Sequence, residues 1–266
     1  MNNFPSFAAI ITAAGKSERF NRNQEESVKK EYLKIDGHTV LYRATEPFFE
    51  IPGLAAVCIT CPEGSEDETL IALEDLADIN TIPFLIIPGG KTRKESVSKA
   101  LNALRSFESN IEYVAIHDGA RPFITPELII KTLAAATIAG SSVPAIRIND
   151  SVKRLGEDGM IKESVEREGL VCVQTPQIFR YREILDAHIS SRNNNATDDI
   201  EIYLEDGKRC MPVQGSAENR KITYLSDIPD AENQIKEYLK EREEGRRSAK
   251  ATRRMRELLY TKGEDE

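Results

Sequence analysis

Short apolar runs rich in β-branched residues alternate along most of the chain with longer stretches that have the period of a helix. The runs cover residues 7–12, 54–60, 82–87, 113–117 and 142–146, and the helical stretches between them cover 39–50, 66–79, 92–107 and 125–139. This alternation is typical of an α/β fold in which helices flank a mainly parallel sheet. Such sheets bind ligands beyond the carboxyl ends of their strands, so we expect functional residues in the loops that follow these runs.

The alternation breaks after residue 146. Residues 147–173 hold two stretches of alternating polar and apolar residues around the turn Gly156-Glu157-Asp158-Gly159, which predicts a β-arm that projects from the sheet. From Thr175 the pattern resumes, with helices predicted at 180–191 and 199–205, a strand at 210–214 and a last helix from about Ser226. We therefore predict one domain over residues 1–236, including the β-arm, followed by a charged helical extension over 237–266.

Charge and composition narrow the class of protein. Within 266 residues, 36 Lys and Arg oppose 44 Asp and Glu, and this net charge of −8 argues against duplex binding through a wide basic face. Basic residues near the C-terminus have acidic neighbours, which favours a solvated helix over a nucleic-acid site. No apolar run approaches the roughly 20 residues that span a bilayer, and no signal-like segment begins the chain, so we expect a cytoplasmic protein without membrane contact.

Cysteine usage agrees with a cytoplasmic location. The four cysteines are too few for a disulfide scaffold in a chain of this size. Cys58 and Cys61 form an isolated pair without a second one, which favours an ordinary strand end over a metal or redox site.

The first predicted strand leads into the segment Ala13-Ala14-Gly15-Lys16-Ser17-Glu18-Arg19. Small residues there let backbone amides come close to a phosphate or nucleotide. The segment is not a P-loop, because Ile10 occupies the position of the first glycine, and a lone Gly15 does not make a dinucleotide fingerprint. Taken by itself, the segment is equally consistent with a basic loop that has no ligand.

Two later loops place polar residues at the same edge of the predicted sheet. Gly89 and Gly90 precede Arg93 and Ser96 at the start of a helix, an arrangement that lets a base approach closely and can meet an anion.

Asp118 ends the fourth apolar run. Its carboxylate can coordinate Mg²⁺ or sugar hydroxyls while Arg121 meets phosphate, and the alternative is that Asp118 caps the loop and pairs with Arg121. His117 is expected to be structural, since neighbouring side chains on a strand point to opposite faces.

These motifs resemble those of the 2-C-methyl-D-erythritol 4-phosphate cytidylyltransferase family, which acts in the non-mevalonate isoprenoid pathway. The matching segments run in order from Ala8 to Ala231: Ala13-Ala14-Gly15…Arg19…Lys29-Lys30-Glu31-Tyr32-Leu33, Gly89-Gly90…Arg93…Ser96-Val97, His117-Asp118-Gly119-Ala120-Arg121-Pro122, Thr175-Pro176-Gln177-Ile178-Phe179, Thr197-Asp198-Asp199 and Asn219-Arg220-Lys221-Ile222-Thr223. This chain has Ser17, Lys29 and Glu31 where the family has glycine, proline and glutamine. The stretch between Arg19 and Lys30 is also longer than usual, which leaves Lys29 as an alternative to Lys30.

The resemblance implies a Rossmann-like nucleotidyltransferase fold and a role for each matched position. By position, Arg19 and Lys30 match the residues that stabilise the transition state at the α-phosphate of CTP, and Arg167 and Lys221 match those that position the incoming phosphate. The remaining assignments are CTP binding by Ala13, Ala14, Gly15, Ser17, Gly89, Gly90, Arg93 and Ser96, and substrate binding by Asp118, Arg121, Ser151, Thr175 and Thr197. Mg²⁺ or another divalent cation is implied as cofactor, with Asp118 as its ligand, and the β-arm is implied to cross into the second subunit of a homodimer.

The predicted reaction is cytidylyl transfer from CTP to 2-C-methyl-D-erythritol 4-phosphate. A phosphate oxygen of the polyol attacks the α-phosphorus directly, giving 4-diphosphocytidyl-2-C-methyl-D-erythritol and pyrophosphate. A ribitol 5-phosphate cytidylyltransferase shares the scaffold and nearly all of these motifs, although the forms of segments 89–97 and 117–122 favour methylerythritol phosphate. An alternative of another class is a noncatalytic nucleotide- or RNA-binding protein that uses the basic tail.

Overall fold

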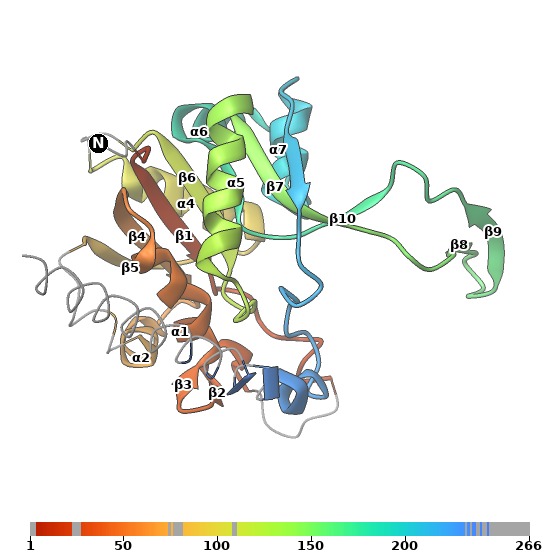
Figure 1. Cartoon of the computed structure of the whole chain (residues 1–266), viewed down its shortest axis with the longest axis horizontal. Coiled ribbons are helices and arrows are strands. Elements are labelled where there is room, and N and C mark those ends of the chain that lie inside the picture. Colours follow the sequence, from red (N-terminus) through yellow and green to blue (C-terminus); the bar gives the residue numbers. More distant parts are fainter. Residues whose placement is uncertain are drawn as a thin grey trace, which may run out of the picture.

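An eight-stranded sheet forms the centre of the molecule, and helices cover both of its faces (Figure 1). The computed structural model describes residues 4–22, 28–73, 76, 82–107, 111–231, 233–234, 236–237, 240 and 244. The strands of the central sheet are β1 (Phe7–Thr12), β4 (Leu54–Cys61), β5 (Phe84–Pro88), β6 (Tyr113–Asp118), β7 (Ser141–Arg147), β10 (Val171–Val173), β11 (Gln177–Arg180) and β12 (Met211–Gln214). The helices are α1 (Val40–Thr45), α2 (Glu66–Ala72), α4 (Arg93–Leu104), α5 (Pro126–Ala139), α6 (Tyr181–Ser190) and α7 (Asp199–Glu205), with short 3-10 helices η1 (Lys30–Tyr32) and η2 (Glu46–Glu50).

The strand order is β10-β7-β11-β6-β1-β4-β5, with β12 beside β7. Strand β1 pairs in parallel with β4 on one side and with β6 on the other, so the chain reverses its direction of travel across the sheet at β1. Open α/β sheets bind ligands at such a reversal, beyond the carboxyl ends of the strands. The mainly parallel α/β fold predicted from the sequence is confirmed, and it points to the end of β1.

Successive residues of β1 enter two separate cores, which fixes the register of the strand. Phe7, Ala9 and Ile11 join a cluster with side chains from α1, η2 and α5, whereas Ala8 and Ile10 face side chains from α4, α6 and α7. Both sets are wholly buried, so the strand is apolar on both faces. This two-sided burial explains why the run lacks the alternation of a half-exposed strand.

Two predicted elements differ from the structure. The helix predicted over 39–50 is split: α1 ends at Thr45 and η2 follows, because Pro47 has no N–H with which to extend an α-helix. The helix predicted over 92–107 is shorter, since Thr92 caps α4 by accepting the N–H of Glu95, and α4 ends at Leu104.

Strand β11 was not predicted at all. It runs antiparallel between β6 and β7 and holds the two parallel parts of the sheet together. It has only four residues, and Ile178 and Phe179 are both fully buried. A strand this short that is apolar on both faces carries no period-2 signal.

The predicted β-arm is present and projects from the body beside β7 and β10 (Figure 1). Strands β8 (Val152–Leu155) and β9 (Ile161–Val165) pair with each other in a separate antiparallel sheet. The Gly156 N–H donates to the Met160 carbonyl at 2.8 Å and closes the turn. A second small hairpin pairs β2 (Lys34–Ile35) with β3 (His38–Thr39).

Most of the predicted extension over 237–266 lies outside the described residues, as does part of the helix predicted over 66–79. The chain is helical at residues 227–231, close to the predicted start at Ser226. No helix in the described part of the chain is long and apolar enough to cross a bilayer.

Candidate active site

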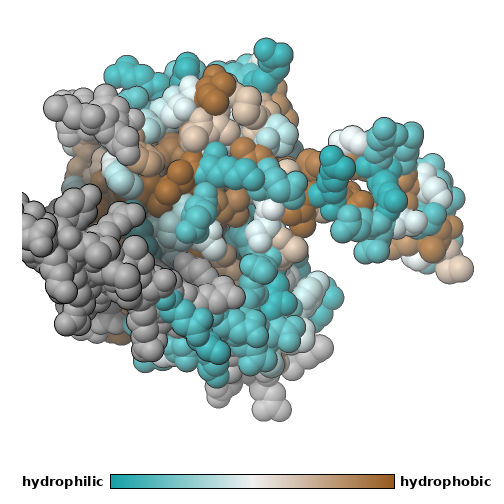
Figure 2. All heavy atoms as spheres, viewed as in Figure 1, coloured by the Kyte–Doolittle hydropathy of each residue, from teal (hydrophilic) through white to brown (hydrophobic). Residues whose placement is uncertain are grey.

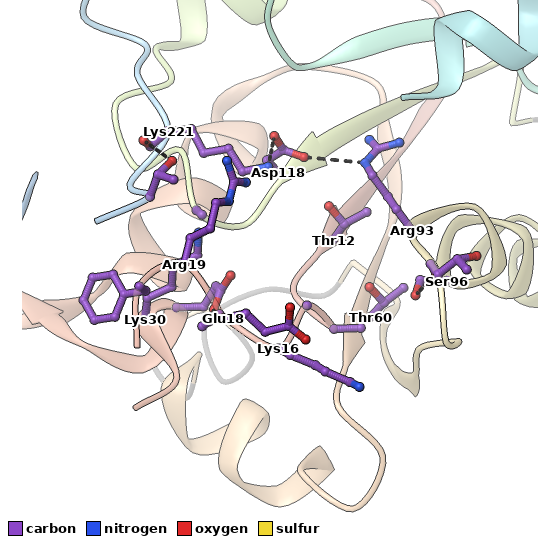
Figure 3. A pocket seen from close by; sticks show the side chains of 18 of the residues that line it. Thr12, Lys16, Glu18, Arg19, Lys30, Thr60, Arg93, Ser96, Asp118 and Lys221 are labelled. Carbon is purple, nitrogen blue, oxygen red and sulfur yellow. Dashed lines mark hydrogen bonds and ion pairs between the residues drawn. The ribbon is translucent and has the colours of Figure 1, made fainter. Parts of the chain in front are cut away.

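A pocket of about 720 Å³ opens at the carboxyl ends of β1, β4 and β6 (Figure 3). Its walls come from the loop after β1, from η1, from the start of α4 and from the segment around residue 221. Ten of the residues singled out in the sequence line it: Ala14, Gly15, Ser17, Arg19, Lys30, Gly90, Arg93, Ser96, Asp118 and Lys221. The fold therefore brings segments that are more than 200 residues apart in the sequence to one site.

The loop after β1 is fastened at both ends. At its start, the Ala13 N–H donates to the Thr60 carbonyl of β4 at 2.9 Å. At its end, Phe20 is buried in a small core with Ile35 and Ile222, and in Figure 3 the preceding Arg19 extends towards Asp118 and Lys221. The loop between these anchors is placed so that residues 14–19 line the pocket.

Beyond Arg19, two hydrogen bonds join the chain on either side of residues 22–27. The Asn21 amide donates to the Val28 carbonyl and accepts the Val28 N–H, both at 2.9 Å. Residues 21 and 28 are thereby joined directly, so the longer stretch between Arg19 and Lys30 begins and ends at one point.

Lys30 and Lys29, the two alternatives for the second cation, have different environments. Lys30 is 8% exposed, lines the pocket and donates from Nζ to the Ile222 carbonyl at 2.6 Å. Lys29 donates to the Gly15 carbonyl and pairs with Glu31, its Nζ 3.0 Å from Oε2. Burial lowers the pKa of Lys30, and the nearby Glu31 carboxylate partly opposes this effect. The geometry favours Lys30 over Lys29 as the residue that meets a ligand.

Asp118 lies at the centre of the charged groups. Its Oδ2 is 3.0 Å from Lys221 Nζ and 3.3 Å from Arg121 Nε, and its Oδ1 is 3.8 Å from Arg93 Nε. Burial alone raises the pKa of the Asp118 carboxyl, but Lys221, Arg93 and Arg121 outweigh it, so this pKa lies far below its usual range. The residue is a permanent anion that organises three cations.

Asp118 pairs with Arg121, the arrangement considered above as a structural alternative. Asp118 also pairs with Arg93 and Lys221, which line the pocket. Arg121 also donates from Nη1 to the Asn219 carbonyl at 2.8 Å. It therefore holds the loop that carries Lys221, and it is absent from the pocket lining.

Arg93 is held from behind by a residue to which no role was assigned from the sequence. Its Nη1 lies 2.6 Å from Asp199 Oδ2, and Asp199 in turn meets His188 Nε2 at 3.2 Å. Asp199 is fully buried, yet Arg93 holds its pKa below the usual value against the effect of burial. The Thr197-Asp198-Asp199 motif contained the signal, but nothing in the local pattern pairs Asp199 with Arg93, which is 106 positions earlier.

The Gly89-Gly90 turn is packed against the first loop. A Cβ atom on Gly89 would lie 2.2 Å from the Ala14 Cβ, and the Gly90 N–H donates to Ser96 Oγ at 2.9 Å. Ser96 Oγ also donates to the Thr92 carbonyl at 3.0 Å. Glycine at position 89 is therefore required by the close approach of two loops, whereas Gly90 and Ser96 line the pocket.

The other predicted substrate-binding residues lie away from the pocket lining. Thr175 is behind Asp118, where its Oγ accepts the Asp118 N–H at 3.1 Å and meets His117 Nδ1 at 3.0 Å. The N–H and hydroxyl of Thr197 both donate to the Glu201 carboxylate near the start of α7. Ser151 and Arg167 belong to the β-arm, where Arg167 donates to the Asn149 carbonyl.

His117 is structural, as expected. It is fully buried, and burial lowers its pKa to about 4, so it is neutral near pH 7.

The donor set at Asp118 fits a Mg²⁺ ion that is completed by phosphate oxygens. Mg²⁺ commonly takes one or two carboxylates and fills its other positions with water and substrate phosphate. Asp118 Oδ2 already accepts from Lys221 and Arg121, while Arg93 Nε lies 3.8 Å from Oδ1, beyond hydrogen-bond distance. We therefore expect Oδ1 to be the oxygen available to a metal. The described residues contain no group of three or more potential ligands that could hold a metal without substrate.

Comparisons with known proteins agree with this geometry. The family model for 2-C-methyl-D-erythritol 4-phosphate cytidylyltransferase matches residues 7–237. The enzyme of that name from Clostridium novyi is 34% identical over 229 residues, which cover 85% of this chain and 94% of the relative. The one from Cereibacter sphaeroides is 35% identical over 231 residues, covering 85% and 95%.

A solved structure has the same fold. The 4-diphosphocytidyl-2C-methyl-D-erythritol synthase of Anaerococcus prevotii aligns with a TM-score of 0.72 and 25% identity, over 87% of this chain and 96% of that one. The chain therefore belongs to the 2-C-methyl-D-erythritol 4-phosphate cytidylyltransferase family and is a nucleotidyltransferase that uses CTP in isoprenoid biosynthesis.

Proposed function

We propose that the pocket at the carboxyl ends of β1, β4 and β6 transfers the cytidylyl group of CTP to 2-C-methyl-D-erythritol 4-phosphate. The observation that carries this proposal is the convergence of Arg19, Lys30 and Lys221 on one pocket that also contains Asp118. Two anions must meet for the reaction to occur, so cations fixed at the meeting point supply the main catalytic effect.

The three cations divide two tasks between them in this proposal. Arg19 and Lys30 face the α-phosphate of CTP and stabilise the charge that develops as the bond to pyrophosphate breaks. Lys221, held against Asp118, orients the phosphate of the incoming polyol. Because the attack is direct and needs no covalent enzyme intermediate, positioning and charge neutralisation suffice. Mg²⁺, held by Asp118 Oδ1, would neutralise part of the triphosphate charge.

The nucleotide would be held by the remaining pocket residues. The backbone of the Ala13–Ser17 loop would approach the triphosphate, and the turn that contains Gly90 would lie against the cytosine. Arg93 and Ser96, at the start of α4, would also bind the CTP. Arg121, Thr175 and Thr197 would contribute to substrate binding indirectly, by holding in place the segments that surround the substrate.

The β-arm would complete the site across a homodimer. Five large apolar side chains between residues 155 and 171 are exposed, namely Leu155, Met160, Ile161, Leu170 and Val171. In Figure 2 apolar and polar surface alternate over this projecting arm. Packing against a second subunit would remove the apolar surface from water. Arg167 and Ser151 would then serve the partner's pocket.

We also assign the catalytic domain to residues 1–236 and the protein to the cytoplasm. The second assignment is supported by the low cysteine content of four in 266 residues.

The decisive experiment measures pyrophosphate release from CTP with methylerythritol phosphate and with ribitol 5-phosphate, each with and without Mg²⁺. We expect turnover with methylerythritol phosphate, dependence on a divalent cation, and poor turnover when ATP or GTP replaces CTP. Lys30→Ala serves as the inactive control. Faster turnover with ribitol 5-phosphate would reassign the substrate, and equal turnover with ATP would overturn the assignment of the base-binding turn.

A further inference from the structure

The three positions at which this chain departs from the first motif of the family meet in space. Glu31 is 4% exposed, and its Oε2 accepts the Ser17 hydroxyl at 3.3 Å and lies 3.0 Å from Lys29 Nζ. The same Lys29 ammonium donates to the carbonyl oxygen of Gly15. One buried carboxylate and one lysine thus connect η1 to two points of the loop after β1. We call Ser17, Lys29 and Glu31 the loop clamp.

The backbone at Ser17 shows why a clamp is needed there. Ser17 has φ +54°, in the left-handed region that glycine adopts freely and that residues with a Cβ adopt at a cost. A serine at this position therefore needs an interaction that holds it in place. The hydroxyl bond to Glu31 supplies it, and the Asn21 N–H closes the following turn on the Ser17 carbonyl at 3.0 Å.

The charges of the clamp also suit its location. Ser17 and Glu31 both line the pocket assigned to the triphosphate, where an unpaired carboxylate would repel phosphate. Lys29 pairs with that carboxylate, so the site gains a fixed anchor without a free negative charge.

We propose that the loop clamp of Ser17, Lys29 and Glu31 positions the loop after β1 to receive the triphosphate. Glu31 is a positioning residue in this inference, because it acts through Ser17 and Lys29 and need not touch CTP. The kinetic part rests on the proposed function, whereas the structural part can be tested without any substrate.

The kinetic test compares the KM for CTP with kcat. Glu31→Ala removes the carboxylate that holds Ser17 and Lys29, so we expect the KM for CTP to rise about tenfold while kcat changes less. Glu31→Gln keeps an oxygen that accepts from Ser17 and Lys29, so it should restore the KM. Ser17→Ala should also raise the KM.

Two variants of exposed residues serve as matched controls. Glu127→Gln on α5 and Lys34→Met on β2 change one charge each outside the pocket and should match the unchanged protein in both readouts. If Glu31→Ala matches them as well, the proposal is wrong. If Glu31→Ala fails to fold, Ser17→Ala and Lys29→Met test the positioning effect with a smaller disturbance.

The structural test uses the full chain without nucleotide. Hydrogen exchange in peptides that cover residues 13–22 should be about tenfold faster in Glu31→Ala than in the unchanged protein, with Glu31→Gln close to the latter. Equal exchange in all variants overturns the clamp even if the enzyme turns over. Conversely, faster exchange in Glu31→Ala together with no pyrophosphate release by the unchanged protein would retain the clamp and reject the proposed reaction.

Discussion

Arg93 Nη1 lies 2.6 Å from Asp199 Oδ2, and the side chain of Asp199 has no exposed surface. The pair links α4, which opens at the pocket, to α7 on the same face of the sheet. Arg93 lines the pocket and also approaches Asp118. The buried Asp199 carboxylate, which is outside the pocket lining, therefore sets the position of Arg93 within it.

Removing Asp199 should therefore affect both stability and nucleotide binding. Asp199→Ala leaves Arg93 largely buried with one partner fewer, so we expect a loss of about 3 kcal/mol in the free energy of unfolding and a raised KM for CTP. Urea denaturation and steady-state kinetics measure the two effects. Asp186→Ala, which removes an exposed aspartate on α6, is the control. Equal effects of the two substitutions would contradict the positioning role.

The pocket cations should dominate the rate. We expect Lys30→Ala and Arg19→Ala each to lower kcat by about 10²–10³, as is typical for the loss of one preorganised charge contact, while CTP binding weakens less. Lys29→Ala should lower kcat far less, because Lys29 contacts the loop backbone and Glu31. A severe effect of Lys29→Ala with a mild effect of Lys30→Ala would reverse the assignment of the two lysines.

Two glycine substitutions distinguish packing from ligand contact. A Cβ on Gly89 would overlap with Ala14, so Gly89→Ala should lower the melting temperature. A Cβ on Gly15 would meet no atom of the described residues within 4 Å, so Gly15→Ala should leave the melting temperature unchanged. Its KM for CTP should nevertheless rise if the backbone approaches the triphosphate. An unchanged KM in Gly15→Ala would remove this loop from the nucleotide site.

Subunit mixing tests the crossing arm. Lys30→Ala and Arg167→Ala are each expected to be inactive, but a mixed dimer with shared sites contains one doubly defective and one intact site. With random exchange half of the dimers are mixed, so activity should recover to roughly a quarter of that of the unchanged protein. Native mass spectrometry verifies the exchange. If exchange occurs and activity does not return, Arg167 serves its own subunit.

His117 should make the fold sensitive to mild acid. Its pKa is about 4 in the folded state and near 6.5 when unfolded, so between these values the unfolded chain binds more protons and stability falls as the pH falls. We expect a loss of about 2 kcal/mol between about pH 7.5 and pH 5 from this residue alone. Urea denaturation at both values measures it. His117→Gln should show a smaller loss, and an equal loss would assign the acid sensitivity to other groups.

Local sequence patterns predicted the strand ends that surround the pocket. The ends of β1, β5 and β6 were placed within two residues because apolar runs and glycine turns mark them, and these ends carry Gly15, Gly90 and Asp118. The choice between Lys29 and Lys30 could not be made in this way. It depends on the Ile222 carbonyl, which lies 192 positions from Lys30.

The features that could not be predicted from the sequence depend on tertiary packing. Strand β11 exists because β6 and β7 each offer it an edge, a condition that its own four residues do not reveal. Asp199 was within a recognised motif, but its function follows from the arginine that packs against it.

The hydrogen bonds that join Asn21 to Val28 have a practical consequence. Because these bonds hold residues 21 and 28 together, the positions of Arg19 and Lys30 do not depend on how many residues lie between 21 and 28. This stretch can therefore gain or lose residues during evolution without moving either cation.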